Sequence, residues 1–136
     1  MRIITGAIVA ASGVVGLVSS AYAADMTGAE IKAFLAGKTA YLETTAASAG
    51  GAAGNVVIYW AEDGTALYRT PSGSIMHGKW EVKGNTNCTD WKERPGTGCV
   101  RYDKVGDVVT VIDVKSGQTR AKIVKTVPGN AEKLAP

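Results

Sequence analysis

His77 has the widest chemical repertoire of any side chain in this sequence, and it is the only histidine. A histidine can activate a serine nucleophile when a carboxylate orients it, and Ser72 and Ser74 are near in sequence. No nucleophile-elbow pattern surrounds these serines, and one histidine excludes sites built from several. A solvent-facing strand histidine is therefore expected, with no catalytic residue, metal or cofactor. A hydrolase that uses His77, or a haem or metal bound to it, remains a remote alternative.

Cys88 and Cys99 are the two cysteines of the chain. Two thiols in an exported protein most simply form one disulfide. Their spacing does not fit a C-x-x-C redox motif, so a redox or metal-binding pair is the weaker interpretation. A hairpin centred between Glu93 and Arg94 places the two cysteines opposite each other, as a cross-strand disulfide requires.

Aromatic side chains gather on the expected strands and indicate where a ligand could bind. Aromatic residues around a barrel mouth would form an apolar pocket, although core packing is the competing interpretation and is favoured for Trp80. Two locations are expected for a ligand or partner surface: the loop of residues 94–98 with Trp91 and Tyr102, or the barrel mouth near Tyr59 and Trp60. The candidate residues are Trp91, Tyr102, Arg94, Tyr59 and Trp60.

The first residues indicate export. Arg2 precedes an uncharged apolar stretch, and Ala21-Tyr22-Ala23 fits the small-x-small pattern at which a signal peptidase cuts. The stretch is shorter than the roughly 20 residues that span a bilayer. Residues 1–23 are therefore predicted to be a signal peptide, with no transmembrane anchor after cleavage. A bacterial periplasmic or secreted location is expected.

Residues 24–136 are long enough for one domain with one core. The whole chain carries a formal net charge of +3 at pH 7, and loss of Arg2 lowers it by one. Such a mild excess argues against nucleic-acid binding, which usually needs a concentrated basic face. The last expected hairpin is basic, which is typical of a protected sheet edge; weak attraction to an anionic envelope surface is the alternative. Its cations are Lys115, Arg120, Lys122 and Lys125.

The pattern of the domain changes from helical to alternating. Thr27 and Glu30 form a capping-box pair, and Gly37 is placed to end a helix over about residues 27–36. Short β segments separated by tight turns follow over about residues 39–127, with a flexible loop at residues 46–54 and a loose tail from residue 128. About eight strands in an antiparallel meander are expected. They would form a small barrel or a two-layer sandwich.

Several short segments, in this order and spacing, resemble those of one family. They are Thr27-Gly28-Ala29-Glu30-Ile31, Asp63-Gly64-Thr65, Gly78-Lys79-Trp80-Glu81-Val82, Cys88 with Trp91, Cys99 with Tyr102, and Val127-Pro128-Gly129-Asn130. In these the chain is similar to a family of small uncharacterised exported proteins of proteobacteria, domain of unknown function 995. The loop at residues 46–54 departs from that pattern. The resemblance implies an exported, disulfide-bearing β fold and brings no activity, substrate or site residues.

The leading functional hypothesis is a non-enzymatic, exported binding protein. It would act through a sheet surface or a small apolar cavity, on an unknown small apolar ligand or an envelope protein. A structural or inhibitor-like interaction factor of the cell envelope is the alternative. No nucleic-acid partner is expected, and the protein is expected to be a monomer.

Overall fold

Strands make up most of the described chain. The computed structural model describes residues 13, 14, 16, 24–45 and 53–136. The one helix among them is α1 (Gly28–Leu35). The strands are β1 (Ala24–Asp25), β2 (Lys38–Thr44), β3 (Gly54–Trp60), β4 (Thr65–Arg69), β5 (Ile75–Lys83), β6 (Thr86–Trp91), β7 (Arg94–Val105), β8 (Val108–Asp113) and β9 (Thr119–Pro128).

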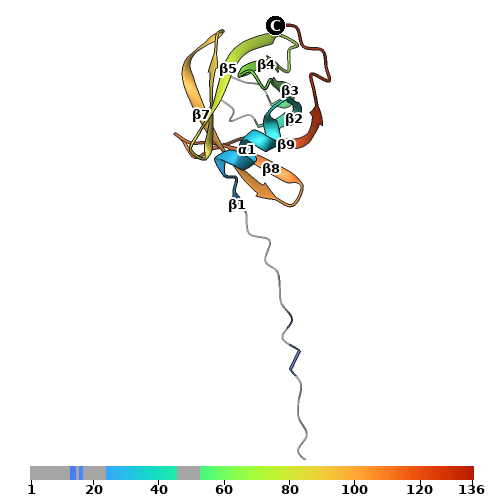
Figure 1. Cartoon of the computed structure of the whole chain (residues 1–136), viewed down its shortest axis with the longest axis vertical. Coiled ribbons are helices and arrows are strands. Elements are labelled where there is room, and N and C mark those ends of the chain that lie inside the picture. The colour runs from blue at the N-terminus through green and yellow to red at the C-terminus, as the bar shows by residue number, and fades with distance from the viewer. Residues whose placement is uncertain (1–12, 15, 17–23, 46–52) are drawn as a thin grey trace, which may run out of the picture.

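Strands β2 to β9 form a closed antiparallel barrel (Figure 1). Each of them pairs with the next strand along the chain, and β9 returns to pair with β2. The short β1 adds to β7. The expected mainly β meander with one N-terminal helix is confirmed, and it takes the barrel form. Closure leaves β9 paired on both sides, so its basic residues do not protect a sheet edge, contrary to expectation.

Local signals set the two ends of α1 as expected. The Thr27 hydroxyl accepts a hydrogen bond from the backbone N–H of Glu30, and the Glu30 carboxylate accepts one from the backbone N–H of Thr27. Gly37 adopts a φ of +70°, a left-handed conformation that glycine tolerates best. Its N–H donates to the carbonyl of Trp60 at the end of β3. The chain therefore turns directly from the helix into the barrel.

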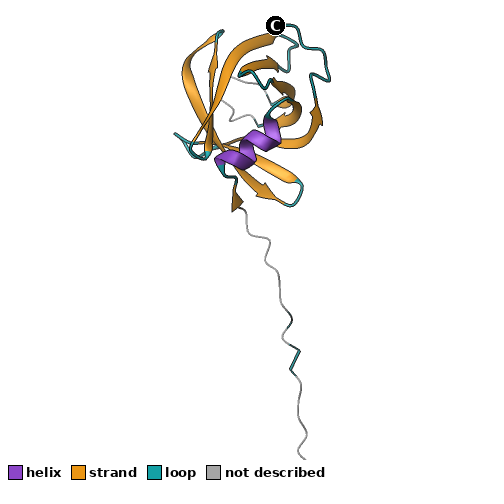
Figure 2. Ribbon diagram, viewed as in Figure 1, coloured by secondary structure: helices purple, strands orange, loops and turns teal. Residues whose placement is uncertain are grey.

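Helix α1 closes one end of the barrel (Figure 2). It contacts β2 on one side of the opening and β5 and β6 on the other. Ile31 and Leu35 are fully buried and belong to the same core cluster as the inward side chains of the strands. Gly28 lies so close to the β5–β6 turn that an added Cβ would overlap the carbonyl oxygen of Gly84.

The C-terminal segment is packed against the barrel, so the expectation of a loose tail from residue 128 is wrong. Thr39 donates from its hydroxyl to the Gly129 carbonyl and accepts from the backbone N–H of Ala131. The Asn130 side chain makes two hydrogen bonds to the backbone of Leu134. Leu134 is buried in a small outer cluster with Val57 and Leu67. The contacts with Thr39, Val57 and Leu67 are long-range, so the sequence near residue 128 carries no local sign of them.

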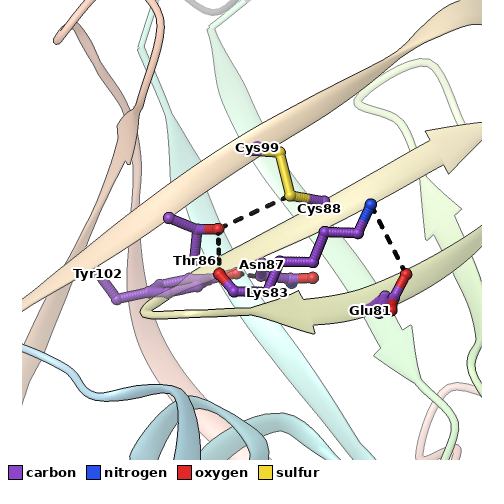
Figure 3. Close-up of a disulfide and its surroundings, with 7 residues drawn as sticks. All are labelled: Glu81, Lys83, Thr86, Asn87, Cys88, Cys99 and Tyr102. Atoms are coloured by element: carbon purple, nitrogen blue, oxygen red, sulfur yellow. Dashed lines mark hydrogen bonds and ion pairs between the residues drawn. A yellow bond between two sulfur atoms is a disulfide. The ribbon is translucent and has the colours of Figure 1, made fainter.

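Cys88 and Cys99 form the expected disulfide and lie directly opposite each other on β6 and β7 (Figure 3). The pairing has the expected register up to Asp90, and then shifts so that Trp91 faces Arg94. The segment 94–98 is therefore the start of β7 and not a loop, which corrects the sequence interpretation. A disulfide between these residues is compatible with an oxidising compartment outside the cytoplasm.

Two sequence predictions fall mostly outside the described residues. The proposed signal peptide covers residues 1–23, and most of the expected flexible loop covers residues 46–52. Both remain predictions. Within the part of the chain that the structure describes, no helix is long and apolar enough to cross a membrane.

Candidate functional site

A cavity of about 140 Å³ opens at the end of the barrel opposite α1. Seven of the barrel strands, all except β5, contribute to its lining. Most of the lining side chains are aliphatic or aromatic, and two are arginines. They are Leu42, Thr44, Ile58, Trp60, Tyr68, Thr89, Trp91, Arg94, Val100, Val111, Arg120 and Ala121. A cavity this size suits a compact molecule, because an engineered apolar cavity of 150 Å³ in another protein binds benzene.

A series of aromatic rings, in edge or tilted contact with one another, connects this cavity with the core. The ring centroid of Trp91 lies 5.6 Å from that of Tyr68 and 6.3 Å from that of Trp60. Trp60 in turn contacts Trp80 at 5.5 Å. Trp60 and Trp80 are both buried, in agreement with the core packing favoured for Trp80, and Trp91 is half-buried. Such contacts favour a fixed arrangement of the rings. Trp60, Tyr68 and Trp91 therefore form a preorganised aromatic wall of the cavity.

Gly78 makes room for the Trp91 ring. A Cβ at this position would lie 2.6 Å from Cε3 of Trp91 and 2.9 Å from the carbonyl oxygen of Asp90. Both distances are shorter than ordinary van der Waals contact. The absence of a side chain on β5 here lets the ring of the neighbouring strand lie close against it.

Arg120 reaches the cavity because the pairing of β8 with β9 is irregular. Val111 pairs with Ala121 and Ile112 pairs with Thr119, which leaves Arg120 as an extra residue on β9. A bulge of this kind re-aims a side chain relative to strict alternation. Arg120 and the adjacent Ala121 consequently both line the cavity. The Nη2 atom of Arg120 lies 3.3 Å from Oδ1 of Asp113, which orients the guanidinium.

Arg94 reaches the cavity at a second irregularity. It lies opposite Trp91 where the register of β6 and β7 shifts, and both side chains line the cavity. Burial raises the pKa of Tyr68, and the positive charge of Arg94 lowers that pKa in part. The guanidinium therefore acts electrostatically on the aromatic wall.

The indole N–H of Trp60 is buried and has no hydrogen-bond partner among the described residues. An unpaired buried donor costs roughly 1–3 kcal/mol, and such groups in native proteins call for an explanation. Trp60 lines the cavity. A polar atom of a bound molecule is one partner that this N–H could take.

Of the five residues predicted for a ligand surface, Trp60, Trp91 and Arg94 meet at the cavity. Tyr59 does not, because neighbours along a strand point to opposite faces; it packs on the outer cluster with Val57 and Leu67. Tyr102 was also expected at the ligand or partner surface, and this prediction is wrong. It is 2% exposed inside the barrel, so it offers no surface to a partner.

Tyr102 instead forms a buried polar pair beside the disulfide (Figure 3). The amide nitrogen of Asn87 donates to its hydroxyl at 3.0 Å, and both side chains are buried. Burial raises the pKa of Tyr102, so the hydroxyl stays protonated at neutral pH. Its role is to hold β6 against β7 in the core.

His77 lies on the outer face of β5, as predicted. Its Nδ1 is 2.6 Å from Oε1 of Glu93, and its backbone N–H donates to Oε2 of the same carboxylate. The hydroxyl of Ser72 is hydrogen-bonded to Thr70 and Ser74. Among the described residues no serine hydroxyl contacts His77, and no cluster of three metal-ligating side chains occurs. The geometry brings together a histidine and a carboxylate without a nucleophile.

Sequence reasoning missed Tyr68 and Arg120 as residues of the site. Tyr68 could have been found from alternation, since it shares the inward face of β4 with Ala66. Arg120 gave no such signal, because its direction depends on the bulge.

A scan of the chain against protein-family models matched no family, and searches of curated proteins and of solved structures also gave no match.

Asp113 gives a testable pH dependence at the edge of the site. Hydrogen bonds from Ser116, together with the charge of Arg120, hold the pKa of Asp113 below its ordinary value of 3.8. A lowered folded-state pKa adds stability above the ordinary value, and this stability is lost as pH falls through the folded-state pKa. Asp113→Asn is expected to lower the free energy of unfolding at pH 7 by about 1–2 kcal/mol. The deficit relative to wild type should shrink below pH 3.8. Urea unfolding at pH 7 and pH 2.5 measures it, and an equal deficit at both would contradict the prediction.

Proposed function

We propose that this protein is an exported, non-enzymatic binding protein that holds one small apolar molecule in the open end of its barrel. The observation that carries the proposal is the cavity of about 140 Å³, where an aromatic wall meets two arginines. Ligand sites in proteins are typically concave, largely apolar, and equipped with a few polar groups that fix orientation. This cavity has that composition on a small scale.

The predicted signal peptide and the disulfide support the export that we propose. The bond between Cys88 and Cys99 suits an oxidising compartment, and the periplasm or the external medium of a bacterium is the proposed location. The resemblance to domain of unknown function 995 remains a prediction that agrees with this location and adds no activity.

Benzene is a suitable first probe, since its size matches the cavity. The chain contains three tryptophans, and their indole N–H resonances can be followed separately by NMR. Trp60 and Trp91 line the cavity, whereas Trp80 donates to the carbonyl of Ala61 and serves as an internal reference. On titration with benzene, the signals of Trp60 and Trp91 are expected to shift and saturate, and the signal of Trp80 to move much less. A dissociation constant of about 1 mM or below, near −4 kcal/mol, is expected.

A matched pair of variants tests whether the cavity is the site. Val100→Phe adds bulk to the lining, and Val124→Phe makes the same change on a side chain that is 49% exposed on the outer surface. Benzene binding should be lost in the first variant and retained in the second. Equal binding by both variants, or no saturable shift in the wild-type protein, would refute the proposal.

A further inference from the structure

The charged side chains that line the cavity indicate which chemical class of ligand it binds. This inference rests on the proposed binding function. We infer that the ligand is a small amphipathic acid: a compact aromatic or short aliphatic group that carries one carboxylate. The apolar part would lie against Trp60, Trp91 and Tyr68, and the carboxylate would lie between Arg94 and Arg120.

The first argument is the positive charge of the side chains that line the cavity. Two of the side chains that line the described cavity are arginines, and none is acidic. A guanidinium is charged at all physiological pH values and matches a carboxylate in geometry through paired N–H donors. Two guanidinium groups in the lining therefore favour a ligand that carries an anionic group.

The second argument is that the guanidinium of Arg120 has N–H donors to spare. Asp113 accepts hydrogen bonds from Ser116 and contacts Arg120 through one nitrogen. A guanidinium has five N–H donors, so one ion pair orients Arg120 without using all of them.

The third argument is that both arginines are placed by irregular strand pairing. Arg120 is the extra residue of the β8–β9 bulge, and Arg94 follows the register shift of β6 and β7. Bulges frequently occur beside functional sites, where they direct side chains. Two independent irregularities thus bring two positive charges to one small cavity.

The fourth argument is the buried indole N–H of Trp60, which has no acceptor among the described residues. A carboxylate accepts several hydrogen bonds. An acid that enters the cavity could supply an acceptor to this donor as well as to the arginines.

Calorimetric titration of the mature chain with three probes tests the inference. Benzoate carries the ring and the charge, benzamide is its neutral isostere, and acetate carries the charge without the ring. Benzoate is expected to bind at least tenfold more tightly than either of the others. Equal affinity for benzoate and benzamide would overturn the inference, as would equal affinity for benzoate and acetate.

Charge-removing variants locate the carboxylate. Arg94→Gln and Arg120→Gln are each expected to weaken benzoate binding about tenfold and to change benzamide binding less than twofold. Arg69→Gln is the control, because Arg69 contacts Glu132 on the outer surface. Since Arg120→Gln leaves Asp113 without its cation, the double variant with Asp113→Asn repeats the test without an unpaired carboxylate. Unchanged benzoate affinity in both the Arg94 and the Arg120 variants would refute the assignment.

The two proposals fail in different ways. Binding of benzene without a preference for benzoate would leave the apolar binding function intact and remove the acid specificity. Absence of binding by benzene, benzoate and benzamide alike would remove both.

Discussion

Replacing Ile31 by Ala is expected to lower the free energy of unfolding by about 3 kcal/mol, the largest effect predicted for a single side chain here. Ile31 is fully buried and belongs to the main core cluster. Truncation of a buried isoleucine typically costs 2–5 kcal/mol, because apolar contact is lost and the space left is only partly refilled. Refilling is limited here, since α1 is tied at both ends by Thr27 and Gly37. Urea-induced unfolding followed by circular dichroism measures the change.

Lys32→Ala is the matched control, because Lys32 is the exposed neighbour on the same helix. It should change the free energy of unfolding by less than about 0.5 kcal/mol. Ile31→Val should fall between the two, at about 1 kcal/mol. Benzene should still bind to the folded fraction of Ile31→Ala, since the cavity lies at the other end of the barrel. An effect below 1 kcal/mol would show that α1 does not close the core as described.

Removal of the disulfide is expected to have the second large effect on stability. The double variant Cys88→Ala and Cys99→Ala is expected to lose about 2–3 kcal/mol of stability, because the bond restricts the unfolded chain over a separation of 11 residues. For a domain of this size the melting temperature should fall by about 10 °C. Thermal unfolding of the oxidised protein, the reduced protein and the double variant compares the three forms.

The reduced wild-type protein and the double variant should melt at similar temperatures, both below the oxidised protein. If reduction does not lower the melting temperature of the wild-type protein, the stabilising role assigned to the bond is wrong. Thr86→Val serves as a control, because it changes a neighbour of Cys88 and leaves both cysteines in place.

The parts of the fold that depend on near neighbours were predictable from the sequence. The capping box of Thr27 and Glu30, the left-handed Gly37 and the register of Cys88 against Cys99 all follow from residues close together in the chain. The same holds for the outward direction of His77, which follows from alternation along one strand.

Features that depend on distant parts of the chain were not predictable. Packing of residues 129–134 needs Thr39, which lies on β2 and is 90 residues from Gly129. The basic residues of β9 are typical of an edge strand, but β9 pairs with both β2 and β8. Tyr102 carried no sign of burial, because its partner Asn87 lies on the neighbouring strand.

Some residues of the candidate site were also predictable from the sequence, and others were not. Trp60 and Trp91 were found because aromatic residues on strands commonly form cores and pockets. Arg120 was grouped with Lys115, Lys122 and Lys125 as a cation of a protected sheet edge. Strict alternation with the buried Ala121 would point its side chain outward. One extra residue in the β8–β9 ladder reverses that direction. Single-sequence patterns do not locate such bulges, so the electrostatic half of the site became visible only in the structure.

The pairing of β2 with β9 has a consequence for how the protein is made. Lys38 near the start of the domain pairs with Pro128 near its end. Individual hairpins can form as soon as their residues are synthesised, but the ring cannot close until β9 has left the ribosome. Contacts between such distant segments also slow folding. The nascent chain therefore remains open for as long as its last strand is missing.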